Sequence, residues 1–231
     1  MSYYFCRQAP GACRSRKPFI AALALVWAFA AATHAHAQNL PSPATPGLIT
    51  PPEGNTAFLV GHASGTQGYV CLPTSPGAST ASWTVKAARP EATLFQTFLG
   101  QPFQIITHFL SPDANPNAVA PKPPPFGSAT WQSTFDSSRV WAAVLNGNSI
   151  APDPNEPSCP HAGSIPCLLL QSIGSQAGPT GGTLLSKTTF VQRLNTNGGA
   201  APATGCSTSE DVGNQVLVPY TADYYFFHQN K

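Results

Sequence analysis

The sequence predicts an all-β protein, a single antiparallel β-sandwich or barrel-like domain with Pro-rich loop insertions. Short runs rich in β-branched and aromatic residues recur along the chain, clusters of Gly, Pro, Asn and Ser separate them, and helical periodicity is nearly absent. We expect ten strands, at residues 57–62, 68–72, 81–86, 103–109, 130–133, 139–145, 168–172, 188–194, 215–218 and 224–228. That many strands in one domain is typical of a sandwich or a barrel.

Turns and loops are predicted between these runs. Residues 65–66, 146–147 and 197–199 contain Gly or Asn, which tolerate the positive φ that tight reversals need. Residues 111–127 include six prolines and predict an extended surface loop, with a polyproline ligand for an aromatic groove as the alternative. Residues 152–166 predict a second loop insertion.

Residues 1–37 have the composition of a signal peptide. Arg14, Arg16 and Lys17 precede an apolar run at 19–32, and Ala35-His36-Ala37 provides the small residues that a signal peptidase accepts. We expect cleavage near Ala37 and a periplasmic or secreted protein. No stable membrane anchor is expected, because 14 apolar residues are fewer than the roughly 20 of a spanning helix.

The charge balance argues against nucleic acid as a partner. Four of the eleven basic residues lie in the leader and all nine acidic residues lie beyond it, so the remaining chain has a net charge of −2. No stripe of Lys and Arg with interleaved aromatic residues is present. Residues 38–52 predict a Pro-rich extended lead without packed structure, and residues 53–231 a single β domain.

Four cysteines follow the leader and predict two disulfides. An oxidising compartment allows three pairings of Cys71, Cys159, Cys167 and Cys206. We predict Cys71–Cys206 and Cys159–Cys167, the second of which closes a short loop that contains two prolines.

A metal or cofactor is not expected. The cysteines have no Cys-x-x-Cys spacing, and the histidines after the leader, His62, His108, His161 and His228, are scattered. The sequence also has no nucleophile elbow, no zinc-binding His-Glu-x-x-His pair and no phosphate-binding glycine loop.

Several strings resemble a known family. They are Gly68-Tyr69-Val70-Cys71, residues 88–95, Thr107-His108-Phe109 with Thr130-Trp131, residues 190–199 and residues 218–227. They are similar to an uncharacterised family of secreted bacterial and fungal proteins, defined only as a domain of unknown function, over about residues 53–227. The resemblance implies Cys71 and Cys206 as the family-type pair, and an added loop and disulfide where the family has Trp at position 167. It implies no mechanism.

Two hypotheses for function remain open. The first is a binding module for a glycan or small neutral ligand, in which aromatic and amide side chains supply the contacts. Its candidate ligand-binding residues are Trp131, Arg193, Asn195, Asp223 and Tyr224. The simpler interpretation is that the aromatic residues pack in the core and that Arg193 forms a salt bridge with Asp223 or Glu91.

The second hypothesis is a cofactor-independent hydrolase or lyase. Glu91 and His108 are the acid and base candidates on predicted ordered elements, and Arg193 would bind an anion. This hypothesis requires the three side chains to converge on one face of the sheet. The simpler interpretation of His108 is a hydrogen-bonded histidine at a strand end.

Overall fold

The computed structural model describes residues 40–85, 91–111 and 127–230, all within the unit Ala37–Lys231. The predicted leader, Lys86 of the third predicted strand and most of the Pro-rich insertion lie outside the described residues. No helix among the described residues is long and apolar enough to cross a membrane.

The described chain is all-β. Its strands are β1 (Asn55–Pro73), β2 (Ala81–Thr84), β3 (Glu91–Phe98), β4 (Gln101–Ser111), β5 (Ser128–Ser133), β6 (Arg139–Ile150), β7 (Cys167–Gln176), β8 (Phe190–Gly198) and β9 (Gln215–Gln229). Two single-turn 3₁₀ helices, η1 (Gly47–Ile49) and η2 (Ser209–Asp211), are the described helical segments.

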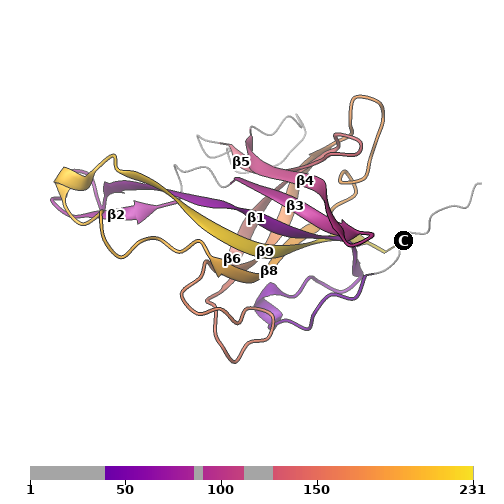
Figure 1. Cartoon of the computed structure of the whole chain (residues 1–231), viewed down its shortest axis with the longest axis horizontal. Helices are drawn as coiled ribbons and strands as arrows, with labels where there is room; N and C mark the ends of the chain where they lie inside the picture. Colours follow the sequence, from indigo (N-terminus) through magenta and orange to yellow (C-terminus); the bar gives the residue numbers. More distant parts are fainter. Residues whose placement is uncertain (1–39, 86–90, 112–126, 231) are drawn as a thin grey trace, which may run out of the picture. The chain divides into compact units, whose positions relative to one another are not determined.

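One antiparallel sheet contains all of these strands and closes into a ring. The order is β2-β1-β3-β4-β5-β6-β7-β8-β9, and β1 also pairs with β9 along most of its length. Beyond the start of β3, β1 and β9 continue side by side as a ribbon, on which β2 adds a third strand (Figure 1). The prediction of an all-β antiparallel domain is confirmed, although the ring is not a regular barrel.

Four of the predicted strands form only two strands in the structure, because the two members of each pair are continuous. The turn predicted at 65–66 is wrong, because β1 continues through it with β9 on one side and β3 on the other. In the same way, β9 replaces the strands predicted at 215–218 and 224–228. Strand β3 was not predicted, although Ala92 and Leu94 alternate inward along it.

The other predicted turns have different outcomes. At 146–147 the chain does not reverse. Strand β6 instead bulges, and its pairing with β7 jumps from Val144 to Ser149. At 197–199 the prediction is confirmed, because β8 ends at Gly198 and both Gly198 and Gly199 have positive φ.

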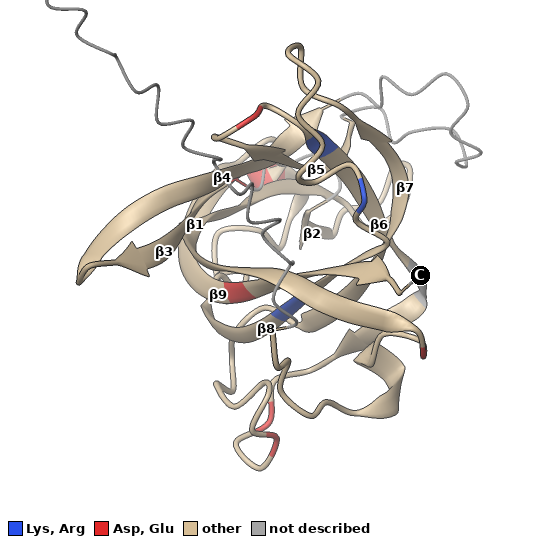
Figure 2. Cartoon of the chain, turned by 90° about the vertical axis from the view of Figure 1, so that its right-hand side faces the viewer, with Lys and Arg blue, Asp and Glu red and all other residues tan. Residues whose placement is uncertain are grey.

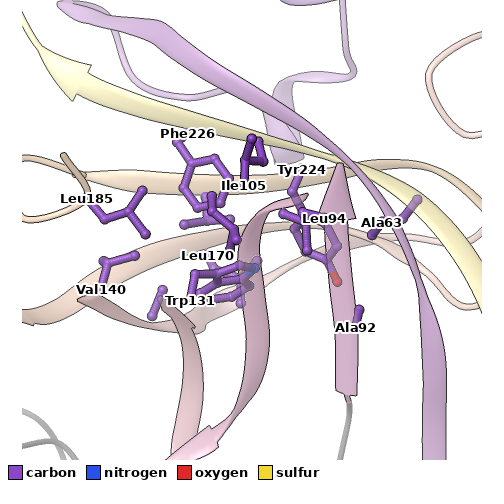
Figure 3. Packing of buried hydrophobic residues seen from close by; sticks show 14 of the residues in the cluster. Ala63, Ala92, Leu94, Ile105, Trp131, Val140, Leu170, Leu185, Tyr224 and Phe226 are labelled. Carbon is purple, nitrogen blue, oxygen red and sulfur yellow. The ribbon is translucent and has the colours of Figure 1, made fainter. Parts of the chain in front are cut away.

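The interior of the ring is filled by apolar and aromatic side chains from every strand of the ring. Trp131, Tyr224, Phe226 and Leu94 are at most 1% exposed, and they converge with smaller residues from the neighbouring strands (Figure 3). Strand alternation explains this arrangement, since every second residue points inward. The residues that alternate with them, such as Ser64, Thr93 and Asp223, therefore lie on the outer face.

A second, smaller core lies on the outside of β7 and β8. Ile49 packs there against Leu169, Leu194 and the disulfide sulfurs, and Gln192 Nε2 donates a hydrogen bond of 2.7 Å to the Ile49 carbonyl. The expectation that the lead does not pack is wrong at Ile49, because this apolar side chain covers the outer face of β8.

Both predicted disulfides are present. Cys71–Cys206 fixes the ribbon of β1 and β9 to the loop before η2, and Cys159–Cys167 closes the predicted loop insertion before β7. The second bridge is completely buried in the outer core.

Candidate functional site

The predicted ligand-binding residues divide between the two faces of the sheet. Trp131 and Tyr224 belong to the inner core and are each 1% exposed. Arg193 is opposite Tyr224 in the β8–β9 register and in phase with the buried Val191, so it also points inward. Asn195 and Asp223 lie together on the outer face, where they hydrogen-bond to each other.

Arg193 is a buried cation, and no acidic residue of the described segments pairs with it. The predicted salt bridge to Asp223 or Glu91 is wrong, because among the described residues no carboxylate lies within ion-pair distance of the guanidinium. Its Nε and Nη2 instead donate hydrogen bonds of 3.2 and 2.7 Å to the Pro166 carbonyl. The side chain therefore holds the disulfide loop to the wall of the ring.

His108 is the imidazole of the inner core. Its Nδ1 donates a hydrogen bond of 2.8 Å to the Thr130 carbonyl, as a neutral ring with its other nitrogen unprotonated can do. Burial lowers the pKa of His108, the Thr130 hydrogen bond opposes this effect, and the positive charge of Arg193 adds a smaller lowering, so that the resulting pKa is about 4. The ring is neutral at pH 7.

A polar cluster forms on the outer face where β1, β9 and β8 lie side by side. His62 is directly opposite Asp223 in the register, and its Nδ1 is 2.6 Å from Asp223 Oδ1. Asn195 Nδ2 donates a hydrogen bond of 2.7 Å to the other oxygen, Oδ2. The carboxylate is thereby fixed from both sides, and the His62 side chain remains 63% exposed.

Asn195 reaches this cluster because the strand is irregular. Alternation along β8 predicts Asn195 on the same face as Arg193, but the register shifts between Leu194 and Asn197 and Asn195 has a φ of 49°. Asn is one of the few residues that adopt this backbone conformation readily. The Asn195 N–H donates a hydrogen bond of 2.9 Å to the carbonyl of Ser158, the residue before Cys159, and this bond holds the bulge in place.

A hollow of about 410 Å³ lies against this cluster. His62, Asp223 and Asn195 border it on one side, and Phe95 and Thr97 of β3 on the other. Phe95 follows the inward-pointing Leu94, so alternation directs its ring outward. The hollow therefore combines a fixed carboxylate, an amide, an imidazole and an aromatic ring. Sequence reasoning missed His62 and Phe95, because their positions depend on the pairing of β1 with both β9 and β3.

A second hollow of about 410 Å³ is bordered by β1, β3 and β4. Glu91 and His108 both border it, but their side chains do not meet. His108 is paired with Ala92 of β3 and stacks on Trp131 in the core. Glu91 is the residue before Ala92, so its side chain points to the opposite face of the sheet and is exposed. Ser64, Thr93 and Thr107 are paired on the outer face and border the hollow, which therefore opens on that face. The structure does not bring Glu91 together with His108 and Arg193.

Charged residues are sparse among the described segments and scattered over the fold (Figure 2). No Lys or Arg in the described part of the chain borders either hollow. The same residues also contain no group of three or more His, Cys, Asp and Glu side chains that could hold a metal ion.

Comparison with known proteins gives a family without an assigned activity. A family model described as "Protein of unknown function (DUF3455)" matches residues 51–228. No curated protein and no solved structure matches this chain. The matched region contains the ring of strands except the last residue of β9, both disulfides and the two hollows described above, and the chain belongs to this family of unknown function.

Proposed function

We propose that this protein is a binding module for a neutral glycan or a similar polyhydroxylated ligand, and that the ligand binds in the hollow beside Asp223. The observation that carries the proposal is the fixed carboxylate, whose two oxygens each accept one side-chain hydrogen bond. Each oxygen keeps a second lone pair for a ligand hydroxyl.

The remaining groups of the hollow suit the same ligand. The Asn195 side-chain oxygen and the exposed His62 ring offer further polar atoms, since only Asn195 Nδ2 and His62 Nδ1 are used by Asp223. Phe95 provides an aromatic ring on which the apolar face of a sugar can pack. A small number of fixed polar groups beside an aromatic surface is the usual composition of a ligand site.

Electrostatics favours a neutral ligand over an anionic one. The described residues that border the hollow include Asp223 but no Lys or Arg. A phosphate or carboxylate ligand would meet the negative charge of Asp223 without a compensating cation. Among the described residues, the hollow therefore has no arginine that could bind the ligand, and the buried Arg193 does not border it.

The test is a binding screen of the purified protein against neutral monosaccharides and disaccharides, followed by calorimetry with any sugar that binds. We expect Asp223→Asn, Asn195→Gly and Phe95→Ala each to weaken binding roughly tenfold or more, the loss of about 1.4 kcal/mol of binding free energy. Glycine at position 195 keeps the positive φ and removes only the amide.

Matched controls lie outside the hollow. Phe103→Ala removes an aromatic ring that is 51% exposed on β4, and Asp153→Asn changes a carboxylate in the segment that precedes the Cys159–Cys167 loop. Both are expected to bind like the unchanged protein. Absence of binding to every sugar tested, or equal losses in the controls and the site variants, would overturn the proposal.

We also propose that the protein acts outside the cytoplasm. The export-type leader and the two disulfides support this, because disulfides persist in oxidising compartments. Mass spectrometry of the protein recovered from the periplasm or the medium should give an N-terminus at Gln38. Recovery of the intact chain from the cytoplasm, with free thiols, would contradict this proposal.

A further inference from the structure

We infer that the ligand is an extended glycan chain, which lies across the outer face from the hollow beside Asp223 to the hollow beside Glu91. This inference rests on the proposed function and specifies its ligand. It follows from the way in which the two hollows are joined, from the side chains between them and from the similarity of their two ends.

The two hollows meet on β1. Ser64 borders both of them, and each has a volume of about 410 Å³. The first is bordered by Asn195 of β8, Asp223 of β9, Ser64 of β1, Phe95 of β3 and Pro102 of β4, and the second by Ser64, Thr93 of β3 and Phe109 of β4. Together they cover five neighbouring strands, which at 4.7–4.9 Å per strand spacing gives a span of roughly 20 Å. This span is several times the length of one sugar ring.

A row of hydroxyl groups crosses the junction. Thr221 of β9 pairs with Ser64, Ser64 pairs with Thr93 of β3, and Thr93 pairs with Thr107 of β4. Thr221 and Ser64 border the first hollow, and Ser64, Thr93 and Thr107 border the second. Paired residues in a sheet lie on the same face, so the row is continuous along the groove.

These hydroxyls are available to a ligand. Among the described residues, the side chains of Ser64, Thr93 and Thr221 form no hydrogen bond with another protein group, and only Thr107 accepts one, from Gln104. Regularly spaced hydroxyls without protein partners match a polymer that repeats its own hydroxyls along its length.

The two ends of the groove have the same chemistry. Asp223 and Phe95 border the first hollow, and Glu91 and Phe109 border the second. Phe109 follows the inward-pointing His108, so alternation directs its ring outward, as it does for Phe95. Each end therefore offers one carboxylate for hydroxyl groups and one ring for an apolar sugar face, and no Lys or Arg among the described residues borders either end.

The experiment compares short and long neutral oligosaccharides on the same protein. Calorimetry with cello-, xylo-, manno- and chito-oligosaccharides of one to six units should show an affinity that rises at least tenfold from the shortest to the longest member of the series that binds. Glu91→Gln and Thr93→Val should weaken the longest member several-fold and leave the shortest unchanged. Glu210→Gln, in the exposed turn of η2, is the matched control and should change neither.

Each outcome has a distinct meaning. Equal affinity for short and long members overturns the extended chain and leaves the proposed function standing, because the hollow beside Asp223 still binds. Absence of binding at every length overturns both. An increase with length that Glu91→Gln and Thr93→Val do not reduce overturns the second hollow as the path of the chain. Circular dichroism of each variant separates a loss of binding from a loss of fold.

Discussion

The imidazole of His108 stacks on the indole of Trp131 in the core of the ring, with ring centroids 4.3 Å apart and an interplanar angle of 7°. Tyr224 packs against both rings. A titratable ring is thus enclosed by aromatic side chains, and burial lowers its pKa to about 4 from the ordinary 6.5.

This enclosure predicts a loss of stability in mild acid. The unfolded chain takes up a proton on His108 as the pH falls below 6.5, whereas the folded protein does so only near pH 4. The stabilising contribution is therefore fully present above pH 6.5 and decreases between pH 6.5 and 4, by on the order of 3 kcal/mol in the free energy of unfolding. Urea unfolding at a series of pH values measures it.

The variant His108→Gln should flatten this part of the pH profile, because an amide can still donate to the Thr130 carbonyl but does not titrate. His161→Gln, in an exposed loop, is the control and should keep the slope. The titration of Asp136 does not contribute to this part of the pH profile. Burial acts to raise its pKa, but hydrogen bonds from Leu184 and Ser138 hold the pKa below 3.8, so its contribution is lost only at lower pH. An unchanged slope in His108→Gln would contradict the assignment.

Gly65 is predicted to be intolerant of a side chain. A Cβ atom at this position would lie 2.1 Å from the Glu91 carbonyl oxygen and 2.6 Å from Ala92 Cα, and neither backbone atom can move without separating β1 from β3. Gly65→Ala should reduce the free energy of unfolding by about 3 kcal/mol, measured by urea unfolding. Gly47→Ala, which meets no atom within 4 Å, should be close to neutral, and equal stability of the two variants would show that β1 and β3 do not approach this closely.

Arg193 is predicted to stabilise the fold through the Pro166 carbonyl. Arg193→Ala removes the buried stem and leaves that carbonyl without its two donors, which should cost about 3 kcal/mol in urea unfolding. Arg193→Lys should cost less, since an ammonium can still donate one hydrogen bond. The control Arg139→Ala, at a partly exposed position, should stay within about 0.5 kcal/mol. A stable Arg193→Ala variant would indicate that the guanidinium does not hold the loop.

The two disulfides are predicted to act differently. Replacing Cys71 and Cys206 with Ala should destabilise the whole domain by up to about 5 kcal/mol, because this bridge closes the longer loop of the unfolded chain. Replacing Cys159 and Cys167 should cost about 2.5 kcal/mol and release the Ser158 carbonyl that accepts from Asn195. Amide hydrogen exchange should then quicken at Asn195 in the second variant only. Faster exchange there in both variants, relative to the rest of β8, would contradict the local role.

The β architecture could be predicted because its signals are local. Runs of β-branched and aromatic residues marked most of the strands, and the simpler interpretation of Trp131 and Tyr224, that they pack in the core, is the one that the structure shows. Strand β3 was missed because Arg89 and Pro90 precede it and Thr and Gln dilute its apolar pattern. The turn at 65–66 was wrong because Gly65 serves the close approach of Ala92 and not a reversal.

The candidate site was only half predicted. Asn195 and Asp223 were named as ligand-binding residues and do lie together, but Trp131, Arg193 and Tyr224 are in the core on the other face. Alternation alone places Asn195 beside Arg193, and the β-bulge reverses that placement. No local pattern indicated His62, which depends on a partner 161 residues away.

The sequence by itself determined the class of fold, most of the strands and the two pairs of cysteines, because these depend on residue type, on spacing and on a small number of alternatives. Only the tertiary structure decided that β1 pairs with both β9 and β3, and that the sheet closes into a ring. The register between distant strands sets which polar side chains meet on the outer face, and a shift of one residue in register moves every side chain of a strand to the other face. For that reason His62, Asp223 and Asn195 became a cluster only in the folded chain.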